Sequence, residues 1–268
     1  MPLHAPQVCV VVTGHDDAPR VTSTVRSALT QGAAVREVLV VDDGSTDGGA
    51  ELLNRLGSRD PRVRVLRRRV HSGGRGSPRN TALDRVTSPY VMFLDGGDAL
   101  LPGAVDALLP GAVGALPAGG LEALPPGARV DVVSGLCARP AQRPLWAHDT
   151  ACGNKLYRTG FLHEHGIRFP EGRFAHGEVV FHARVLAAGP RVTFVPKRVY
   201  VPHAPPVPDA PALAEAYRLA YDILLAAGRT ELAETVRSGR PARTPPFATS
   251  RSRGVVDAVL GGLRRLIH

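Results

Sequence analysis

A repeated alternation of apolar runs and amphipathic segments constrains the fold of this chain more than any other feature. Residues 7–14, QVCVVVTG, form a continuous and largely β-branched run, which is typical of a strand buried on both faces. Residues 18–32 follow with apolar side chains at helical spacing and a terminal glycine. The order then repeats, with strands expected within 36–49, 62–68 and 90–95 and helices within 48–57 and 77–86. This alternation predicts a parallel sheet built from right-handed crossovers.

The chain changes character after residue 102, where Pro and Gly become frequent, and we expect one helix followed by a loose connection. Further elements are expected in this order: a strand at 129–139, a turn and short helix at 154–166, a helix at 177–189, two short strands around Pro196 within 191–203, and a helix at 210–228. We therefore predict a domain over 1–205, a helical extension over 206–240, and a linker with a basic amphipathic helix over 241–268.

Charge and cysteine content narrow the class of protein. The 268 residues carry a net charge of +9 and nearly all of the positive charge is arginine, which suits bidentate phosphate contacts but is also what a GC-rich genome produces. No basic patch is interleaved with aromatics, so we expect no nucleic-acid partner. The three cysteines form no CxxC pair, which argues against a zinc site or a disulfide framework. No apolar run reaches the roughly 18 residues that span a bilayer, and we expect no signal peptide.

Acidic residues follow three of the expected strands. They lie in the stretches Thr13-Gly14-His15-Asp16, Asp42-Asp43-Gly44-Ser45 and Asp95-Gly96-Gly97-Asp98. Ligands of an open parallel sheet bind outside the carboxyl ends of its strands, so these groups predict a negative pocket suited to a divalent cation and a diphosphate. Alternatively, the acids after the second strand only cap a turn and the next helix.

These segments resemble the family 2 glycosyltransferases with the GT-A fold. The resemblance rests on VCVVVTGHD, VREVLVVDDGSTDGGAELL, DPRVRVL, HSGGRGSPRNTAL and SPYVMFLDGGDALLPGAV, which together cover about 8–104. It continues more weakly over 154–200, which looks like the acceptor half of bacterial cell-envelope members. The resemblance implies a Rossmann-like α/β fold with a mostly parallel central sheet, flanking helices and a C-terminal helical extension. It also implies that 1–104 binds a nucleotide sugar and that 105–205 binds the acceptor.

The resemblance assigns the nucleotide base to the ends of the first two strands. Thr13 and His15 fall where the family contacts the base, with His15 in place of the usual tyrosine. Asp43 would accept a hydrogen bond from the base N–H, and Asp42 would support the loop.

The family's diphosphate and metal sites fall on the next two loops. HSGGRGSPRN matches the loop near the diphosphate, so Arg75 and Arg79 are phosphate candidates. The family binds Mg²⁺ or Mn²⁺ through Asp-x-Asp; here Asp95 matches the first acid, Gly97 replaces the ligating acid, and Asp98 matches an additional acid. Three alternatives stay open. In the first, Asp98 replaces the missing ligand; in the second, metal binding is weak and Arg79 supplies the positive charge in its place. In the third, the protein is an inactive relative.

The weaker part of the resemblance supplies the remaining candidates. Glu178 matches the carboxylate that removes the proton from the acceptor hydroxyl. His176 and Lys155 are candidate acceptor contacts, and His203 is a candidate metal ligand. Alternatively, Glu178 is only an acid at the start of a helix, and Lys155 belongs to a structural turn. His176 and His203 would then be ordinary surface histidines.

The leading hypothesis is an inverting glycosyltransferase that moves a sugar from a UDP-linked donor to a hydroxyl of a glycan or lipid-linked acceptor. The product would belong to cell-envelope or secondary-metabolite glycan synthesis. The alternative is a degenerate relative that binds a nucleotide sugar or a partner protein. A nucleotidyltransferase would need a glycine-rich basic loop directly after the first strand, and TGHDDAPR lacks one. We expect a cytoplasmic protein whose C-terminal helix is a candidate contact with the inner face of the plasma membrane.

Overall fold

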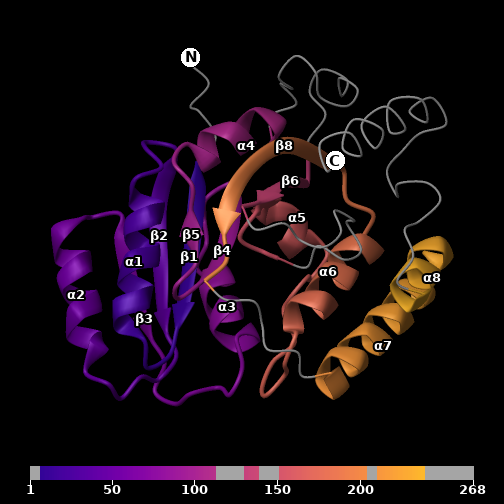
Figure 1. Cartoon of the computed structure of the whole chain (residues 1–268), viewed down its shortest axis with the longest axis horizontal. Coiled ribbons are helices and arrows are strands. Elements are labelled where there is room, and N and C mark those ends of the chain that lie inside the picture. The colour runs from indigo at the N-terminus through magenta and orange to yellow at the C-terminus, as the bar shows by residue number, and fades with distance from the viewer. Residues whose placement is uncertain (1–6, 113–129, 139–150, 204–209, 239–268) are drawn as a thin grey trace, which may run out of the picture.

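A single eight-stranded sheet forms the centre of the molecule, with helices on both of its faces (Figure 1). The computed structural model describes residues 7–112, 130–138, 151–203 and 210–238. The strands are β1 Val8–Gly14, β2 Val35–Asp42, β3 Val63–Arg67, β4 Tyr90–Asp95, β5 Ala99–Leu100, β6 Val132–Cys137, β7 Lys155–Arg158 and β8 Val192–Val201. The helices are α1 Ala18–Leu29, α2 Gly49–Arg59, α3 Gly76–Leu83, α4 Ala104–Ala112, α5 Thr159–Glu164, α6 Gly177–Ala187, α7 Ala210–Ala226 and α8 Thr230–Ser238.

The strand order is β3-β2-β1-β4-β7-β6-β8-β5. The first four strands of this order are mutually parallel, which confirms the predicted crossovers between 7 and 95. Strand β7 runs antiparallel to both of its neighbours, β4 and β6. The mixed α/β fold with a mostly parallel sheet is therefore the predicted one.

Alternating residues of the central strands build two separate cores. Val10 and Val12 of β1 face the side that α1, α2 and α4 cover. Cys9 and Val11 face the opposite side, where α3, α5 and α6 pack. Side chains of a strand point alternately to the two faces, so a strand covered on both sides has to be apolar throughout. This explains why the run in 7–14 is continuous.

Two details of the second half differ from the sequence-based prediction. Residues 154–166 contain the predicted short helix, α5, but 155–158, where a turn is expected, form the interior strand β7. Residues 191–203 form one strand, β8, and not two strands around Pro196. The pairing with β6 shifts from Ser134↔Phe194 to Leu136↔Arg198, so extra residues of β8 bulge out around Pro196, which has no N–H to donate.

Helices α7 and α8 lie within the predicted helical extension and form a third core with α6 (Figure 1). Ala216, Ala220 and Leu224 of α7 are fully buried there, and Val180 of α6 is one of their partners in this core. The assignment of 1–104 and 105–205 to donor and acceptor stays a prediction. The linker and basic amphipathic helix predicted over 241–268 lie outside the described residues.

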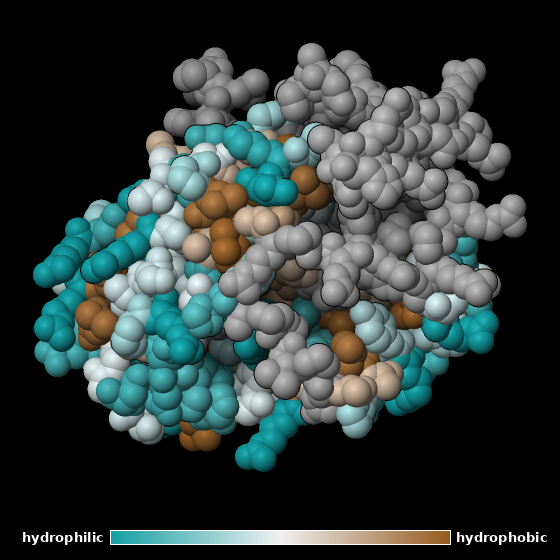
Figure 2. Space-filling model, in the orientation of Figure 1, coloured by the Kyte–Doolittle hydropathy of each residue, from teal (hydrophilic) through white to brown (hydrophobic). Residues whose placement is uncertain are grey.

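The surface over α1 and α2 is largely hydrophilic in Figure 2, with only small apolar areas. Among the described residues, the exposed large hydrophobic side chains are Val70 and Leu225. None of the helices in the described ranges combines the length and the apolar character that a membrane span requires.

Candidate active site

A cleft of about 670 Å³ opens at the carboxyl ends of β1, β2 and β4. The loop between β3 and α3 and the start of α6 close its other sides. The predicted site residues that line it are Thr13, His15, Asp43, Arg75, Arg79, Asp95, His176 and Glu178. The structure thus brings together residues from five segments that are widely separated in the sequence.

Asp42 and Asp43 have different surroundings although they are adjacent. The Asp42 carboxylate is buried, accepts a hydrogen bond from the backbone N–H of Ser45 at 3.0 Å, and lies 3.2 Å from Nε of Arg67. It therefore holds the loop and does not line the cleft. Asp43 lines the cleft, and its Oδ2 accepts hydrogen bonds from the backbone N–H and the hydroxyl of Ser72, at 3.1 and 2.7 Å.

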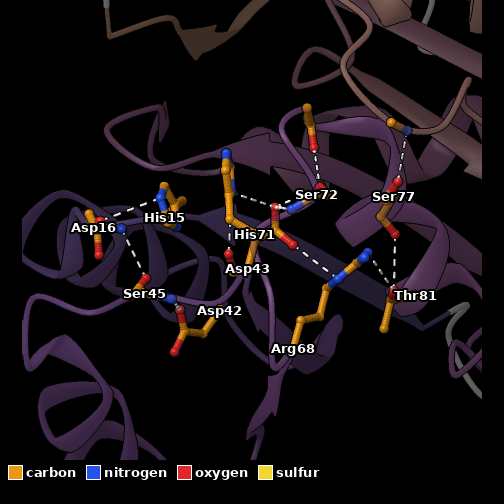
Figure 3. A network of polar contacts seen from close by, with 12 residues as sticks. His15, Asp16, Asp42, Asp43, Ser45, Arg68, His71, Ser72, Ser77 and Thr81 are labelled. Carbon is orange, nitrogen blue, oxygen red and sulfur yellow. Dashed lines mark hydrogen bonds and ion pairs between the residues drawn. The ribbon is translucent and has the colours of Figure 1, made fainter.

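A stacked pair of imidazoles lies beside Asp43. The ring centroids of His15 and His71 are 3.7 Å apart and their planes differ by 14°. Nδ1 of His71 lies 2.9 Å from Oδ2 of Asp43, and Nε2 of His15 lies 3.3 Å from Asp16. Figure 3 shows this network with the two rings face to face. The predicted base contacts His15 and Asp43 are therefore both in contact with His71, which sequence reasoning did not single out.

Asp95 forms the centre of a cluster of positive charge. Its Oδ1 accepts hydrogen bonds from Nη2 of Arg79 at 2.7 Å and from the hydroxyl of Thr13 at 3.2 Å. Its Oδ2 accepts one from Nη1 of Arg75 at 2.9 Å. Burial alone would raise the pKa of this carboxyl, but the two guanidinium charges and the hydrogen bonds outweigh burial and lower the pKa. Asp95 is therefore ionised and fully engaged by protein donors.

The two arginines differ in how they are held. The Arg79 side chain is 4% exposed, stacks over the ring of Phe169 at 4.9 Å, and its Nε has no hydrogen-bond partner among the described residues. Arg75 is 66% exposed on the rim of the cleft. Arg79 is thus a fixed positive charge in the wall, and Arg75 is the one free to turn toward a ligand.

Asp98 is turned away from the cleft. Its Oδ2 accepts hydrogen bonds from the hydroxyl of Tyr200 at 2.7 Å and from the backbone N–H of Asp95 at 3.0 Å, and its Oδ1 accepts one from the backbone N–H of His203 at 3.1 Å. Burial, together with the nearby charge of Asp95, raises the pKa of Asp98 despite these hydrogen bonds. Its place in the structure is that of a support for the loop.

The residues present do not fit the divalent metal that the resemblance implies. Gly97 has a φ of +95°, and a Cβ on it would lie 2.6 Å from Cγ of His203, so that ring fills the space where the missing acid would start. Both oxygens of Asp95 and both of Asp98 already accept protein hydrogen bonds. Across the described ranges no group of three His, Cys, Asp or Glu side chains is arranged to hold a metal ion. Mg²⁺ requires well-placed free oxygens, which this loop does not offer.

Glu178 lies in the first turn of α6 and faces the cleft. Within the described ranges, its carboxylate has no hydrogen bond or ion pair, while its backbone oxygen contacts Nδ1 of His182 at 2.8 Å. His176 precedes it as the N-cap of α6 in a left-handed conformation with φ 55°. A half-buried carboxylate in this position can accept a proton from a ligand in the cleft.

Lys155, the other candidate acceptor contact, lies apart from the cleft. It is fully buried in β7, and its Nζ donates to the backbone oxygen of Ala151 at 2.7 Å and to Oδ1 of Asn154 at 2.9 Å. Arg173 lines the cleft but was not singled out from the sequence. No pattern in its segment, FPEGRFAHGE, distinguishes Arg173 from a surface arginine.

Comparison with known proteins agrees with this geometry. Residues 9–113 match the model of the family described as "Glycosyl transferase family 2". A chondroitin synthase of Pasteurella multocida is 35% identical over 100 residues, which cover 37% of this chain and 10% of that entire protein. The succinoglycan biosynthesis protein ExoU of Rhizobium meliloti is 28% identical over 204 residues, 70% of this chain and 59% of ExoU. The chain thus spans only a part of the length of these relatives.

Among solved structures, residues 1–349 of S. aureus TarS in complex with UDP superpose with a TM-score of 0.66 and 20% identity, over 92% of this chain and 74% of that chain. At this identity the likeness shows the fold, which is the GT-A fold expected from the sequence. The comparisons thus show a match to the family 2 glycosyltransferases over residues 9–113 and a GT-A fold over most of the chain.

Proposed function

We propose that the chain is an inverting glycosyltransferase that moves a sugar from a UDP-linked donor to a hydroxyl of a bacterial glycan or lipid-linked acceptor. One observation carries the proposal: a single cleft gathers Asp43, Arg79, Asp95 and Glu178 from four separate segments. TarS, the similar structure, was solved with UDP and with UDP-GlcNAc, which supports a uridine nucleotide as the donor. The cell-envelope and exopolysaccharide relatives support the class of acceptor.

In this proposal the two ends of the cleft have different roles. Thr13, His15 and Asp43 hold the nucleoside, and Arg75 and Arg79 face the diphosphate. The charge of a leaving nucleoside diphosphate needs fixed positive groups around it. Arg79 is preorganised for this by its burial and by its pair with Asp95. No step is assigned to a metal ion, because the described loop lacks the ligands for one.

Glu178 is the proposed general base. As the acceptor oxygen attacks the anomeric carbon, Glu178 takes the hydroxyl proton, and the bond from that carbon to the diphosphate oxygen breaks. The new glycosidic bond forms on the opposite face of the sugar, and the nucleoside diphosphate leaves with the electron pair. His176, next to the base, is proposed as an acceptor contact.

Donor binding tests the first half of the proposal. Calorimetric titrations with UDP, UDP-glucose, UDP-GlcNAc and GDP-mannose are run once with Mn²⁺ and once with EDTA. We expect a uridine ligand to bind in both media, because Arg75 and Arg79 supply the positive charge. Failure of every nucleotide to bind would reject the proposed function.

Substitution of Glu178 by Gln tests the second half. Removal of a general base typically lowers a rate by about 10²–10⁴-fold. We expect Glu178→Gln to lose sugar transfer by that factor while its donor dissociation constant stays within about twofold of the wild-type value. Unchanged transfer would show that another group is the base.

A second candidate function is nucleotide-sugar binding without transfer. The engagement of Asp98 by Tyr200 and His203, together with Gly97, favours it. It predicts that UDP binds but that no acceptor in a screen of envelope glycans receives sugar. Transfer that depends on Glu178 would exclude it.

A further inference from the structure

The side chain of His71 makes the two contacts that a nucleobase offers. Its planar ring lies on the ring of His15, with centroids 3.7 Å apart and planes that differ by 14°. Its Nδ1 lies 2.9 Å from Oδ2 of Asp43. Nδ1 also lies 3.3 Å from the backbone oxygen of Asp43, and because carboxylate and carbonyl oxygens only accept hydrogen bonds, Nδ1 carries the proton. A flat ring that stacks on one face and donates a ring N–H at its edge is also a description of uracil.

The same contacts leave no place on Asp43 for a second N–H donor. Oδ2 already accepts hydrogen bonds from the backbone N–H and the hydroxyl of Ser72, and Nδ1 of His71 lies 2.9 Å from it. Oδ1 lies 3.0 Å from Nε of Arg68, but it accepts no hydrogen bond from the described residues, and it is buried. Nδ1 of His15 is likewise buried and without a hydrogen-bond partner among them. Oδ1 of Asp43 and Nδ1 of His15 therefore both lack a hydrogen-bond partner among the described residues. No ligand can reach them while His71 is in place.

His71 can leave by rotation of its side chain alone. The side chain is 42% exposed and follows β3 on the rim of the cleft. Its backbone passes close to Gly44, where φ is +75° and a Cβ would lie 2.6 Å from the backbone nitrogen of His71. Exposed side chains change rotamer within picoseconds to nanoseconds. Figure 3 shows that the ring of His71 projects from this loop toward His15 and Asp43.

We propose that His71 is an internal stand-in for the nucleobase, and that the donor must displace its ring from His15 and Asp43 in order to bind. The proposal rests on the proposed function and deepens it. Displacement of His71 costs the same for every ligand that places a base there, so ligands differ only in the contacts that they make in its place. A base with a ring N–H next to its carbonyl groups, such as uracil, replaces both, whereas cytosine has no such ring N–H and replaces only the stacking.

The test compares ligands that do and do not carry the base. Dissociation constants for UDP, CDP and pyrophosphate are measured by calorimetry on the full chain and on His71→Ala, with His165→Ala as a control at an exposed histidine outside the cleft. Removal of a competing internal ligand increases apparent affinity by the inverse of the fraction that is open. We expect His71→Ala to bind UDP and CDP on the order of tenfold more tightly, with pyrophosphate unchanged.

A second measurement follows the ring itself. In NMR spectra of the wild-type chain, UDP should shift the ring signals of His71, and pyrophosphate should leave them in place. Wild-type chain that binds UDP, with His71→Ala that binds it equally or more weakly, overturns the stand-in and makes His71 a wall of the base site, while the proposed function stands. An equal change for UDP and pyrophosphate assigns His71 a structural role. If no nucleotide binds either chain, the proposed function fails and this proposal fails with it.

Discussion

At the scale of single residues, Asp95 determines the electrostatics of the cleft. It lies between a buried and an exposed arginine and accepts hydrogen bonds on both oxygens. The charge of Arg79 is tolerable inside the protein only because Asp95 faces it, since a buried unpaired charge is strongly unfavourable. The carboxylate that matches the first acid of the family's Asp-x-Asp is here paired with two arginines.

This pairing predicts the effect of Asp95→Asn on stability. The substitution leaves the guanidinium of Arg79 without its counter-charge, and we expect a loss of about 3–5 kcal/mol in the free energy of unfolding. The pKa of Asp95 is lowered by folding, so its contribution is present above the unfolded value near 3.9 and is lost as pH falls through the folded pKa. Asp95→Asn should therefore flatten the acid side of the stability profile.

Urea unfolding from pH 7 down to pH 3 measures both effects. Asp84→Asn is the control, because Asp84 forms an exposed pair with Arg168 and exposed pairs contribute only about 0–1 kcal/mol. Equal losses in the two variants would contradict the assigned role of Asp95.

At the scale of elements, α7 closes the core that α6 leaves open. Leu224 is fully buried in the contact with α6 and α8, whereas Leu225, the next residue, is 45% exposed. Helical geometry places adjacent side chains about a quarter of a turn apart, so one leucine faces the core and the other the solvent. The start of α6, which carries Glu178, is therefore held in part by a helix from another region of the chain.

The two leucines make a matched pair for a test. Leu224→Ala should lower the free energy of unfolding by about 2–5 kcal/mol, because it removes buried methyl groups and leaves a cavity. Leu225→Ala should change it by less than about 1 kcal/mol. Chemical denaturation of both variants measures these changes in the free energy of unfolding. Similar losses in the two variants would show that α7 does not pack as described.

At the scale of the whole molecule, two of the three cysteines report on global unfolding. Cys9 is fully buried in β1, and Cys152 is 5% exposed, with a pKa that burial raises to about 12. Cys137 is partly exposed at the end of β6. Only a thiolate reacts readily with an alkylating reagent, so buried thiols react at the rate at which the fold opens.

We expect one thiol to react rapidly with iodoacetamide at pH 8 and the other two to react only in denaturant. Mass spectrometry of peptides identifies Cys137 as the reactive residue, and the Cys137→Ser chain should show no rapid phase. Rapid labelling of Cys9 would contradict a sheet covered on both faces.

Local sequence was sufficient for the first half of the fold. The run 7–14 is apolar on both alternations, which only a strand with helices on each side requires, and residues 36–95 repeat the pattern. The strand β7 was not predictable in this way, because Lys155 and Arg158 make it read as a turn. Its side chains are accommodated by partners far along the sequence, including Asp131 for Arg158. Pro196 likewise indicated a break that the bulge in β8 avoids.

For the candidate site, the sequence by itself determined which chemical groups follow the strands, because the carboxyl ends of parallel strands share one edge of the sheet. It placed Asp43, Asp95 and Glu178 among the candidates, and the fold gathers them in one cleft. Only the tertiary structure decided which groups are available to a ligand. Tyr200 and His203 donate hydrogen bonds to Asp98, and the ring of His71 lies against the carboxylate of Asp43. The reason is that hydrogen bonds over long sequence separations depend on distance and direction in space, which no local pattern of residues encodes.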